Sequence, residues 1–421
     1  MTQGDIRITP GQEHGLACLG VEHDDLAARG EEARTHVTVA GDLCWTPRPG
    51  VPEPAELDEC PWAPFAALLS AQELSIANLE AALTPLDQPI AKSGPRVRSA
   101  PSLAGVVRRG GFGAVSLANN HVGDFGERGV VDTLEACRAA GLLTVGAGAD
   151  VQAAEAPLVV ERGGVRLAFV AATEGNLGAA GSGRAGTAAL RNGRAQTAVA
   201  RLSAAGAATV VLLHAGNEYY PLPSPYLVDL AHSFVEAGAS AVVIHHQHMP
   251  GGVQVHRGVP VVYGTGNFLF PMYYPYVHPG WHQGYLVRLG FSGTRVSELT
   301  LFPYHQSRGQ RRVEAMPPDE AEELAARLRE RSAALADAST LEREWERFCG
   351  EQRPRLLAAL LGMTRLERRL VRLLGIWPRW RMRPDRVAAL LTLLATESYS
   401  QAAMTTLKEE LRRTGVSSRG V

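Results

Sequence analysis

The sequence lacks the features that would place a chain in a membrane, in a disulfide-bonded fold or on nucleic acid. It contains no run of about 18 uninterrupted apolar residues, the length that a membrane-spanning helix needs. Its five cysteines include no Cys-x-x-Cys pair, which argues against a disulfide framework and against a four-cysteine zinc site. The net charge of -1 gives no reason to expect nucleic-acid binding.

Lysine is scarce, and no amino-terminal leader is expected. Lys92 and Lys408 are the only lysines, so arginine carries almost all of the positive charge. The first residues, Met1 to Arg7, mix acid and base and are followed by no apolar run, so we expect no signal peptide. The odd number of cysteines and the lack of a visible signal peptide predict a cytoplasmic protein in a reducing compartment.

Stretches of different character divide the chain into parts. Residues 1–34 are polar, show no periodic apolar pattern and are predicted to be a loosely ordered extension. Residues 35–315 alternate short apolar runs with amphipathic stretches, which predicts an α/β domain with helices on both sheet faces. Residues 316–421 follow a polar link and carry long helical patterns, which predict a separate α-helical C-terminal unit.

Apolar runs and glycine stops locate the main elements of the α/β domain. The predicted strands are Val37–Ala40, Leu74–Ala77, Ala114–Ala118, Leu167–Ala171, Thr209–Leu213, Ala241–Ile244 and Pro260–Tyr263. The predicted helices are Pro64–Gln72, Gly129–Ala140, Gln196–Ala205 and Pro225–Ala237. The last three of these helices end near a glycine of the kind that caps a helix C-terminus.

The C-terminal unit contains a basic amphipathic stretch. Ten arginines and three acidic residues lie between Glu351 and Arg386, together with several leucine pairs. Such a stretch suits a peripheral membrane contact or a partner protein. The reading that we favour is docking of the leucines against the main domain, where the stretch could also cover the edge of an active site.

Polar side chains that suit a metal ion follow the predicted strands at the points where the strands end. They are Asp42, Glu80, Asn119, Asn120, His121, His214, Glu218, His245, His246, His248 and Asn267. Because the carboxyl ends of parallel strands lie along one edge of a sheet, we expect these side chains to meet in one crevice.

The chemistry of this set favours divalent metal ions. Carboxylate, imidazole and amide oxygen suit Zn²⁺, Mn²⁺ or Fe²⁺. The candidates exceed what one tetrahedral ion needs, so we expect a two-metal site in which Glu80 or Asp42 bridges and a metal-held hydroxide is the nucleophile. Taken singly, Asp42 could be a turn residue and His214 a satisfied core histidine. Three imidazoles directly after a buried strand, at 245–248, are costly to place without a partner.

The ordered motifs over residues 35–305 resemble those of the CapA-type poly-γ-glutamate (capsule) biosynthesis proteins. They are Ala40-Gly41-Asp42, Asn78-Leu79-Glu80, Leu117-Ala118-Asn119-Asn120-His121 with Asp124 and Gly126, His214-Ala215-Gly216-Asn217-Glu218, His245-His246-Gln247-His248, and Tyr263-Gly264-Thr265-Gly266-Asn267-Phe268. That family is similar to the calcineurin-like metallophosphoesterases, so the resemblance implies an α/β/β/α sandwich that carries two metal ions.

The resemblance also implies roles for individual residues. The metal ligands would be Asp42, Glu80, Asn120, His214, His246 and His248. His121 would be the proton donor to the leaving group, and Glu218 would stand behind the ligands or face the substrate. Cys44 occupies a position where phosphoesterases of this superfamily commonly have a histidine, so either its thiolate binds zinc or that ligand is missing.

Candidate substrate-binding residues lie near these motifs. Arg96 and Arg98 belong to a basic loop that could hold a substrate carboxylate or phosphate, or simply be solvated. Asn267 follows the last strand and is a third candidate. The aromatic stretch 273–282 could form a pocket wall or lid, and core packing or a dimer contact would explain it nearly as well. The oligomeric state is left open.

The leading hypothesis is a metal-dependent hydrolase that acts on a phosphoester or on an amide or γ-glutamyl bond. One alternative is a non-catalytic assembly factor for poly-γ-glutamate or capsule synthesis, which would bind an acidic polymer or a synthase subunit. Another is a tailoring enzyme of a small-molecule pathway. Many members of the family carry a membrane anchor, which is not visible here, so a role in export at the membrane is put in doubt. The complete ligand set favours catalysis.

Overall fold

The computed structural model describes residues 6–27, 35–47, 53, 56–57, 59–69, 73–92, 94–174, 178–271, 278–307, 311–360, 363–364, 367, 369 and 390. Apart from the last two residues, the chain divides into two compact units, Met1–Leu341 and Glu342–Arg419. The first unit contains all of the strands described below. The second is represented mainly by the greater part of helix α8 (Ala338–Leu360).

Among the described residues, ten strands form the first sheet, with the order β1-β2-β19-β18-β3-β4-β7-β8 and with β17 beside β3 and β20 beside β19. Their bounds are β1 Arg7–Glu13, β2 Leu16–Glu22, β3 Thr35–Leu43, β4 Leu74–Leu79, β7 Ala114–Ser116, β8 Leu143–Val145, β17 Asn267–Leu269, β18 Gln283–Ser292, β19 Arg295–Gln306 and β20 Val313–Ala315. The neighbours β3, β4, β7 and β8 are parallel, whereas β18 and β19 pair antiparallel.

The second sheet has the strand order β10-β11-β13-β14-β16-β15. Its strands are β10 Leu158–Arg162, β11 Val165–Thr173, β13 Ala208–His214, β14 Ala241–His245, β15 Val253–His256 and β16 Val259–Val262. The four central strands are parallel, and β10 and β15 add antiparallel edges. Short pairs link β5 (Ala82–Leu83) with β6 (Arg98–Ser99) and β9 (Ala147–Gly148) with β12 (Gly186–Thr187).

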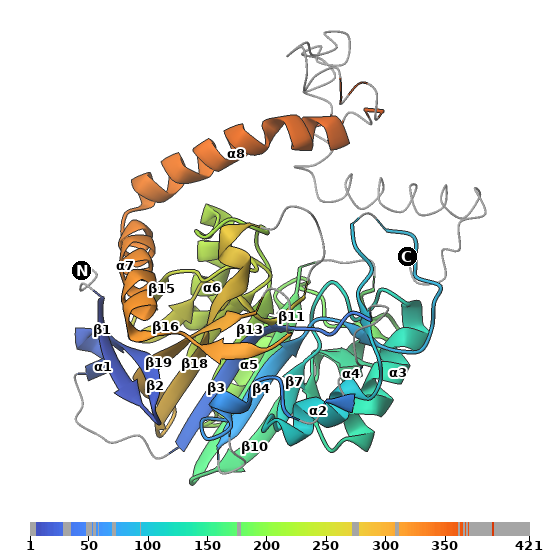
Figure 1. Cartoon of the computed structure of the whole chain (residues 1–421), viewed down its shortest axis with the longest axis horizontal. Helices are drawn as coiled ribbons and strands as arrows, with labels where there is room; N and C mark the ends of the chain where they lie inside the picture. The colour runs from blue at the N-terminus through green and yellow to red at the C-terminus, as the bar shows by residue number, and fades with distance from the viewer. Residues whose placement is uncertain are drawn as a thin grey trace. The chain divides into compact units, whose positions relative to one another are not determined.

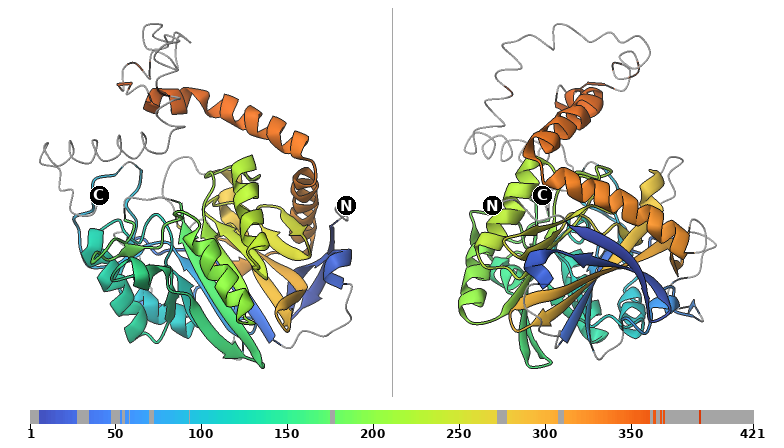
Figure 2. Two further views of the ribbon diagram at one scale, coloured as in Figure 1. Left: turned by 180° about the vertical axis from the view of Figure 1, so that it is seen from behind. Right: turned by 90° about the vertical axis from the view of Figure 1, so that its left-hand side faces the viewer.

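Helices cover the outer faces of both sheets (Figures 1 and 2). Those of the first unit are α1 Asp24–Ala27, α2 Leu103–Arg109, α3 Gly126–Ala139, α4 Val151–Glu155, α5 Arg194–Ala204, α6 Pro225–Glu236 and α7 Pro318–Leu335, with 3-10 turns at Ala63–Phe65 and Pro279–His282. Helices α2 and α3 share a core with the first sheet, and α5 and α6 share another with the second. The layers therefore run helices, sheet, sheet, helices.

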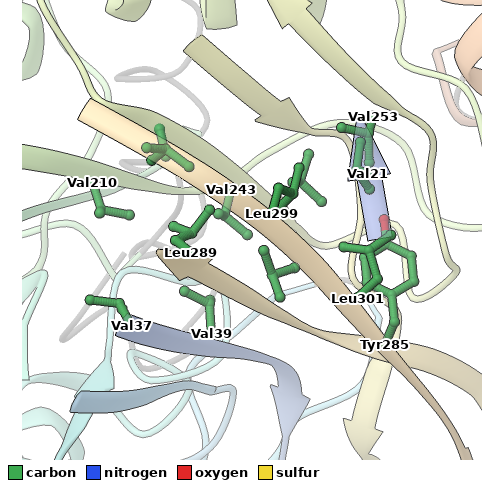
Figure 3. Packing of buried hydrophobic residues seen from close by; sticks show 14 of the residues in the cluster. Val21, Val37, Val39, Val210, Val243, Val253, Tyr285, Leu289, Leu299 and Leu301 are labelled. Carbon is green, nitrogen blue, oxygen red and sulfur yellow. The ribbon is translucent and has the colours of Figure 1, made fainter. Parts of the chain in front are cut away.

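Alternation along the central strands builds the core between the sheets. On β13, Val210 and Leu212 belong to this core, whereas Val211 and Leu213 pack with the helices. The same parity holds on β14, where Val243 points to the middle layer. Figure 3 shows Val210 and Val243 close to Val37, Val39 and Leu289 of the first sheet. Both faces of each central strand are buried, which explains why the strands read as continuously apolar runs.

The predicted α/β class is confirmed, because every predicted strand overlaps an observed strand. Three predicted helices correspond to α3, α5 and α6. The prediction over Pro64–Gln72 is wrong for its described residues, 64–69, which form a 3-10 turn at Ala63–Phe65 and a following turn, while residues 70–72 lie outside the described residues. Phe65, Leu68 and Leu69 are all buried, so a short turn produces the same apolar spacing as a helix.

The amino-terminal segment also differs from its prediction. Strands β1 and β2 form a hairpin that joins the first sheet through β19, where a loosely ordered extension was expected. Most residues of β1 are exposed, so the strand has no apolar alternation for sequence reasoning to find. Residues 1–5 and 28–34 lie outside the described residues.

Helix α7 lies within the first compact unit. It contacts β1, β2 and β15 and places Leu324, Ala325 and Leu328 in the core between the sheets. Most of the predicted basic stretch lies outside the described residues, so its role stays a prediction, as do the domain boundaries at 34/35 and 315/316. In the part of the chain that the structure describes, no helix has the length and apolarity needed to cross a bilayer.

Candidate functional site

A bulge in β3 turns Asp42 toward the space between the sheets. Val37 and Val39 face the middle core, and Ala40 and Leu43 face the helices. The register between β3 and β4 shifts between Ala40 and Asp42, so one extra residue changes the parity of the strand. That residue is Gly41, and a Cβ there would lie 1.9 Å from the carbonyl oxygen of Gly266. Only glycine fits, and Asp42 takes its orientation from it.

Asn78 joins the strand ends of the two sheets. Its Nδ2 donates to Asp42 Oδ1 at 2.7 Å and lies 3.2 Å from His214 Nδ1, at the end of β13. Its Oδ1 accepts from Asn119 Nδ2 at 3.2 Å. Asn78 was not among the candidate ligands, although it precedes Glu80 by two residues. Asn78 is two residues from Ile76 on β4, so both side chains lie on the inward face of the strand. This spacing is the signal that sequence reasoning could have used.

Glu80 lies at the centre of the histidines and is completely buried. Its Oε1 is 3.5 Å from His214 Nε2, 3.8 Å from His121 Nε2 and 3.9 Å from His248 Nε2. Neither carboxylate oxygen accepts a hydrogen bond from a described residue. Burial, and then the charge of Asp42, raise the pKa of Glu80 well above its usual range. A carboxylate in such a place is costly unless a cation compensates it.

Two overlapping groups of possible ligand atoms surround this carboxylate. One comprises Asp42, Glu80 and His214, and the other comprises Glu80, His246 and His248, with the atoms of each group within 4.8 Å of one another. Glu80 belongs to both groups and could therefore contact two ions. The buried Nδ1 of His246 also has no hydrogen-bond partner among the described residues.

The histidine run at the end of β14 has an unusual backbone. His246 and His248 have φ values of 100° and 57°, a region that residues other than glycine rarely occupy. Such conformations persist only when the surroundings impose them, and they cluster at functional sites. His245 belongs to neither group of possible ligands, and its Nε2 lies 3.1 Å from the carbonyl oxygen of Ala40.

Burial keeps most of these imidazoles neutral, the form in which they bind metals. It lowers the pKa of His214 well below its usual range and that of His246 to about 4. Burial would also lower the pKa of His248, but the hydrogen bond that its Nδ1 donates to Asp42 Oδ2, 3.2 Å away, raises it overall. Burial alone would raise the pKa of Asp42, and the same contact with His248 lowers it.

Asn120 and His121 follow β7 and reach the same cluster. Asn120 Oδ1 lies 3.0 Å from His214 Nε2. His121 Nδ1 lies 2.7 Å from Asp124 Oδ2, which leaves Nε2 on the side of Glu80. Burial lowers the pKa of His121, and Asp124 partly opposes that effect.

Lys92 stabilises the positions of Asp124 and Asn120. Its ammonium group pairs with the second oxygen of Asp124 and donates to the backbone oxygen of Asn120 at 3.0 Å. Sequence reasoning gave Lys92 no place in the metal site. Its rarity in an arginine-rich chain was the available signal, since all positive charge before Lys408 otherwise comes from arginine.

The proposed substrate residues occupy different positions. Arg96 is exposed and donates to the carbonyl oxygen of Gly94, and Arg98 donates to that of Pro85 at 3.1 Å, so both support their own loop. Asn267 is buried with its Oδ1 2.9 Å from His248 Nδ1. Glu218 is half-buried, and its charge acts on the pKa values of Glu80, His246 and His248. Their roles toward substrate stay predictions.

Cys44 lies in an apolar cluster beside the site. It packs with Val97, Phe270 and Trp281 and is fully buried. Burial, and then the charge of Glu80, raise the pKa of its thiol well above the usual range, which favours the protonated form. Cys44 belongs to neither group of possible metal ligands, and its role as a ligand stays a prediction.

Aromatic rings line the outer side of His248. The Trp281 ring is 4.7 Å from the His248 ring, and Tyr219 lies 5.8 Å from Trp281. Tyr219 has a φ of 62°, which is rare for an aromatic residue. Trp281 comes from the predicted aromatic stretch, of which residues 273–277 lie outside the described residues.

Comparison with known proteins connects these residues with capsule synthesis. Residues 36–272 match the family model described as bacterial capsule synthesis protein PGA_cap. The chain is 31% identical over 231 residues to a probable polyglutamine synthesis accessory protein of Mycobacterium tuberculosis, covering 49% of this chain and 58% of that protein. It is 30% identical over 205 residues to the capsule biosynthesis protein CapA of Bacillus anthracis, covering 47% and 45%.

A third relative is the PGA biosynthesis protein CapA of Bacillus subtilis, 28% identical over 213 residues, with 49% of this chain and 51% of that protein covered. The chain thus spans about half the length of the curated relatives that it matches.

Proposed function

We propose, from the premise that this chain belongs to the bacterial capsule synthesis protein PGA_cap family, that it is a metal-dependent hydrolase with a dinuclear centre. The family match covers more than half of the chain, and the predicted CapA-type resemblance is confirmed. The order of its layers is the one expected of a calcineurin-like metallophosphoesterase, and we include that fold relationship in the proposal.

The observation that carries the proposal is the Glu80 carboxylate. It is fully buried, accepts no hydrogen bond from a described residue and lies among imidazoles, of which burial keeps His214 and His246 neutral while His248 pairs with Asp42. Neutral imidazoles cannot balance its charge, so the cluster fits divalent cations better than it fits a purely structural role. The donor set of carboxylate, imidazole and amide oxygen suits zinc, manganese or iron.

The residues divide into two sets of ligands that share Glu80. Asp42 and His214 would hold one ion, and His246 and His248 would hold the other. Asn120 would add its amide oxygen beside His214. Ions bound there would supply a Lewis acid for attack on a phosphoryl or carbonyl group.

His121 is placed to move a proton in this reaction. Asp124 orients the ring through Nδ1, and Lys92 fixes Asp124, so that Nε2 faces the cluster. A proton on Nε2 can pass to the leaving oxygen of a phosphoester or the leaving nitrogen of an amide or γ-glutamyl bond. We take these bonds as the two substrate classes to be tested.

The test combines metal analysis of the full chain with hydrolysis of p-nitrophenyl phosphate, bis(p-nitrophenyl) phosphate and γ-glutamyl-p-nitroanilide. Glu80→Gln should bring metal content close to background. His121→Asn should keep the metal and lower kcat by about 10²- to 10⁴-fold. His14→Asn, in the exposed turn between β1 and β2, is the matched histidine control and should change neither property.

The results of these assays distinguish a metal-dependent hydrolase from a non-catalytic assembly factor. Metal at background in the unaltered chain would contradict the proposal at its base. Stoichiometric metal without hydrolysis of any probe would replace the hydrolase by a non-catalytic assembly factor. Hydrolysis of only one probe class would identify the bond.

A further inference from the structure

A cavity lies away from the candidate metal cluster, between α4, α5 and the outer face of β11. Its volume is about 590 Å³, within the range of about 300–1,000 Å³ that small-molecule sites occupy. None of the residues that line it belongs to the cluster around Glu80. The left view of Figure 2 shows α5 lying against the second sheet, where this cavity is found.

Small side chains explain why the cavity is open. Where α5 crosses β11, the helix presents Ala195 and Ala198, and the strand presents Ala172. On the neighbouring strand β13, the larger Val211 and Leu213 fill the corresponding layer. Because a methyl group reaches only a short distance from the backbone, the helix and the strand leave unfilled space between them.

Charged groups stand on one side of this apolar space. Arg194, Ala198 and Arg201 follow one another at the spacing i, i+4, i+7, which puts them on one face of α5. Arg194 pairs with Glu155 of α4 at 2.7 Å. The guanidinium of Arg201 makes no ion pair or hydrogen bond with any residue in the described part of the chain.

These features specify the chemistry of an occupant. Glu155 neutralises Arg194, so one positive charge remains for a ligand. Guanidinium groups bind carboxylate and phosphate through paired hydrogen bonds. The alanine walls and Val170 offer an apolar surface to the rest of the molecule.

We propose that this cavity binds a small molecule with an apolar body and a single anionic group, a carboxylate or a phosphate monoester. Its anion pairs with Arg201, and its body packs between α5 and β11. The site goes beyond the proposed hydrolase activity and does not depend on it, because binding here requires neither the metal nor His121.

Calorimetric titration of the full chain tests the proposal with three probes. These are 4-phenylbutyrate, phenyl phosphate and the neutral 4-phenylbutyramide. We expect one of the anions, or both, to bind with 1:1 stoichiometry, and the amide to bind at least about tenfold more weakly, the effect of losing one charged hydrogen-bonded pair. The preference between carboxylate and phosphate identifies the source of the anion.

Variants locate the binding. Arg201→Gln should weaken the anion by about tenfold, and Ala198→Phe should abolish binding by filling the space. Arg166→Gln, which changes an exposed arginine on β11, is the matched control and should leave affinity unchanged. Glu80→Gln should also leave it unchanged, which separates this cavity from anion binding at the metal cluster. Circular dichroism verifies that each variant is folded.

Any of four results would overturn the proposal. No anion binds up to the solubility limit, or the amide binds as tightly as the anions. Alternatively, folded Arg201→Gln retains full affinity, or Glu80→Gln abolishes binding.

Discussion

Gly41 determines, at the scale of single residues, which way the Asp42 carboxylate points. The residue forms the bulge in β3, and no side chain fits between it and the Gly266 carbonyl. We expect Gly41→Ala to destabilise the protein by about 1–3 kcal/mol, the usual cost of overpacking, and to reduce bound metal. Thermal unfolding and metal analysis measure both effects.

Gly20→Ala is the control, because a Cβ at that strand position would meet Thr9 at an ordinary distance of 3.5 Å. Equal stability and metal content in the two variants would show that the bulge does not control Asp42.

Asn78 is a second residue that decides the geometry of the cluster, in this case through its side chain. Because it bonds Asp42 and lies against His214, Asn78→Leu should release both and weaken metal binding by about 10- to 100-fold. Competition with a chelator measures the change. Ser75→Ala, on the same strand, removes a buried hydroxyl that has no hydrogen-bond partner among the described residues, and should leave metal affinity intact. Equal losses in both variants would indicate general damage to β4.

At the scale of elements, a charged pair joins the start of β3 to the residue before β4. His36 Nδ1 lies 3.2 Å from Glu73 Oε1. The hydrogen bond to Glu73 raises the pKa of His36, and the same bond lowers the pKa of Glu73. Stability from His36 is lost as pH rises through its raised pKa, and stability from Glu73 is lost as pH falls through its lowered one. The pair therefore stabilises most between about pH 4.5 and 6.5, the ordinary values of the two groups.

We accordingly expect His36→Gln to lower the urea midpoint more at pH 5.5 than at pH 8. Since the pair is partly exposed, the difference should be small but resolvable. If the difference in urea midpoint between the variant and the unaltered chain is the same at both pH values, this account of the pair is contradicted.

The elements that sequence reasoning found and missed differ in how they are buried. Strands such as β13 and β14 are buried on both faces, so their apolar runs stand out, and the candidate ligands directly after them could be predicted as a group. Strand β1 is mostly exposed and carries no such pattern. The inward orientation of Asp42 depends on a bulge, and the exposed position of Arg96 depends on the conformation of its loop. A periodic sequence pattern encodes neither of these features.

At the scale of the whole molecule, the cluster exists because two sheets meet face to face. Asp42 and Asn78 come from the first sheet, and His214 comes from the second. Sequence reasoning could place all of them at the carboxyl ends of strands, but not assign the strands to two sheets, because pairing partners are not written in a local pattern. The contribution of α7 to the middle core was hidden for the same reason.

The most direct test of the central claim is a crystal of the full chain grown with zinc or manganese and measured at the absorption edge of the metal. The account predicts two anomalous peaks, about 3.5–4 Å apart, that share the Glu80 carboxylate. One peak would lie against Asp42 and His214, and the other against His246 and His248. Absence of a peak within about 2.5 Å of Glu80, at saturating metal, would contradict it.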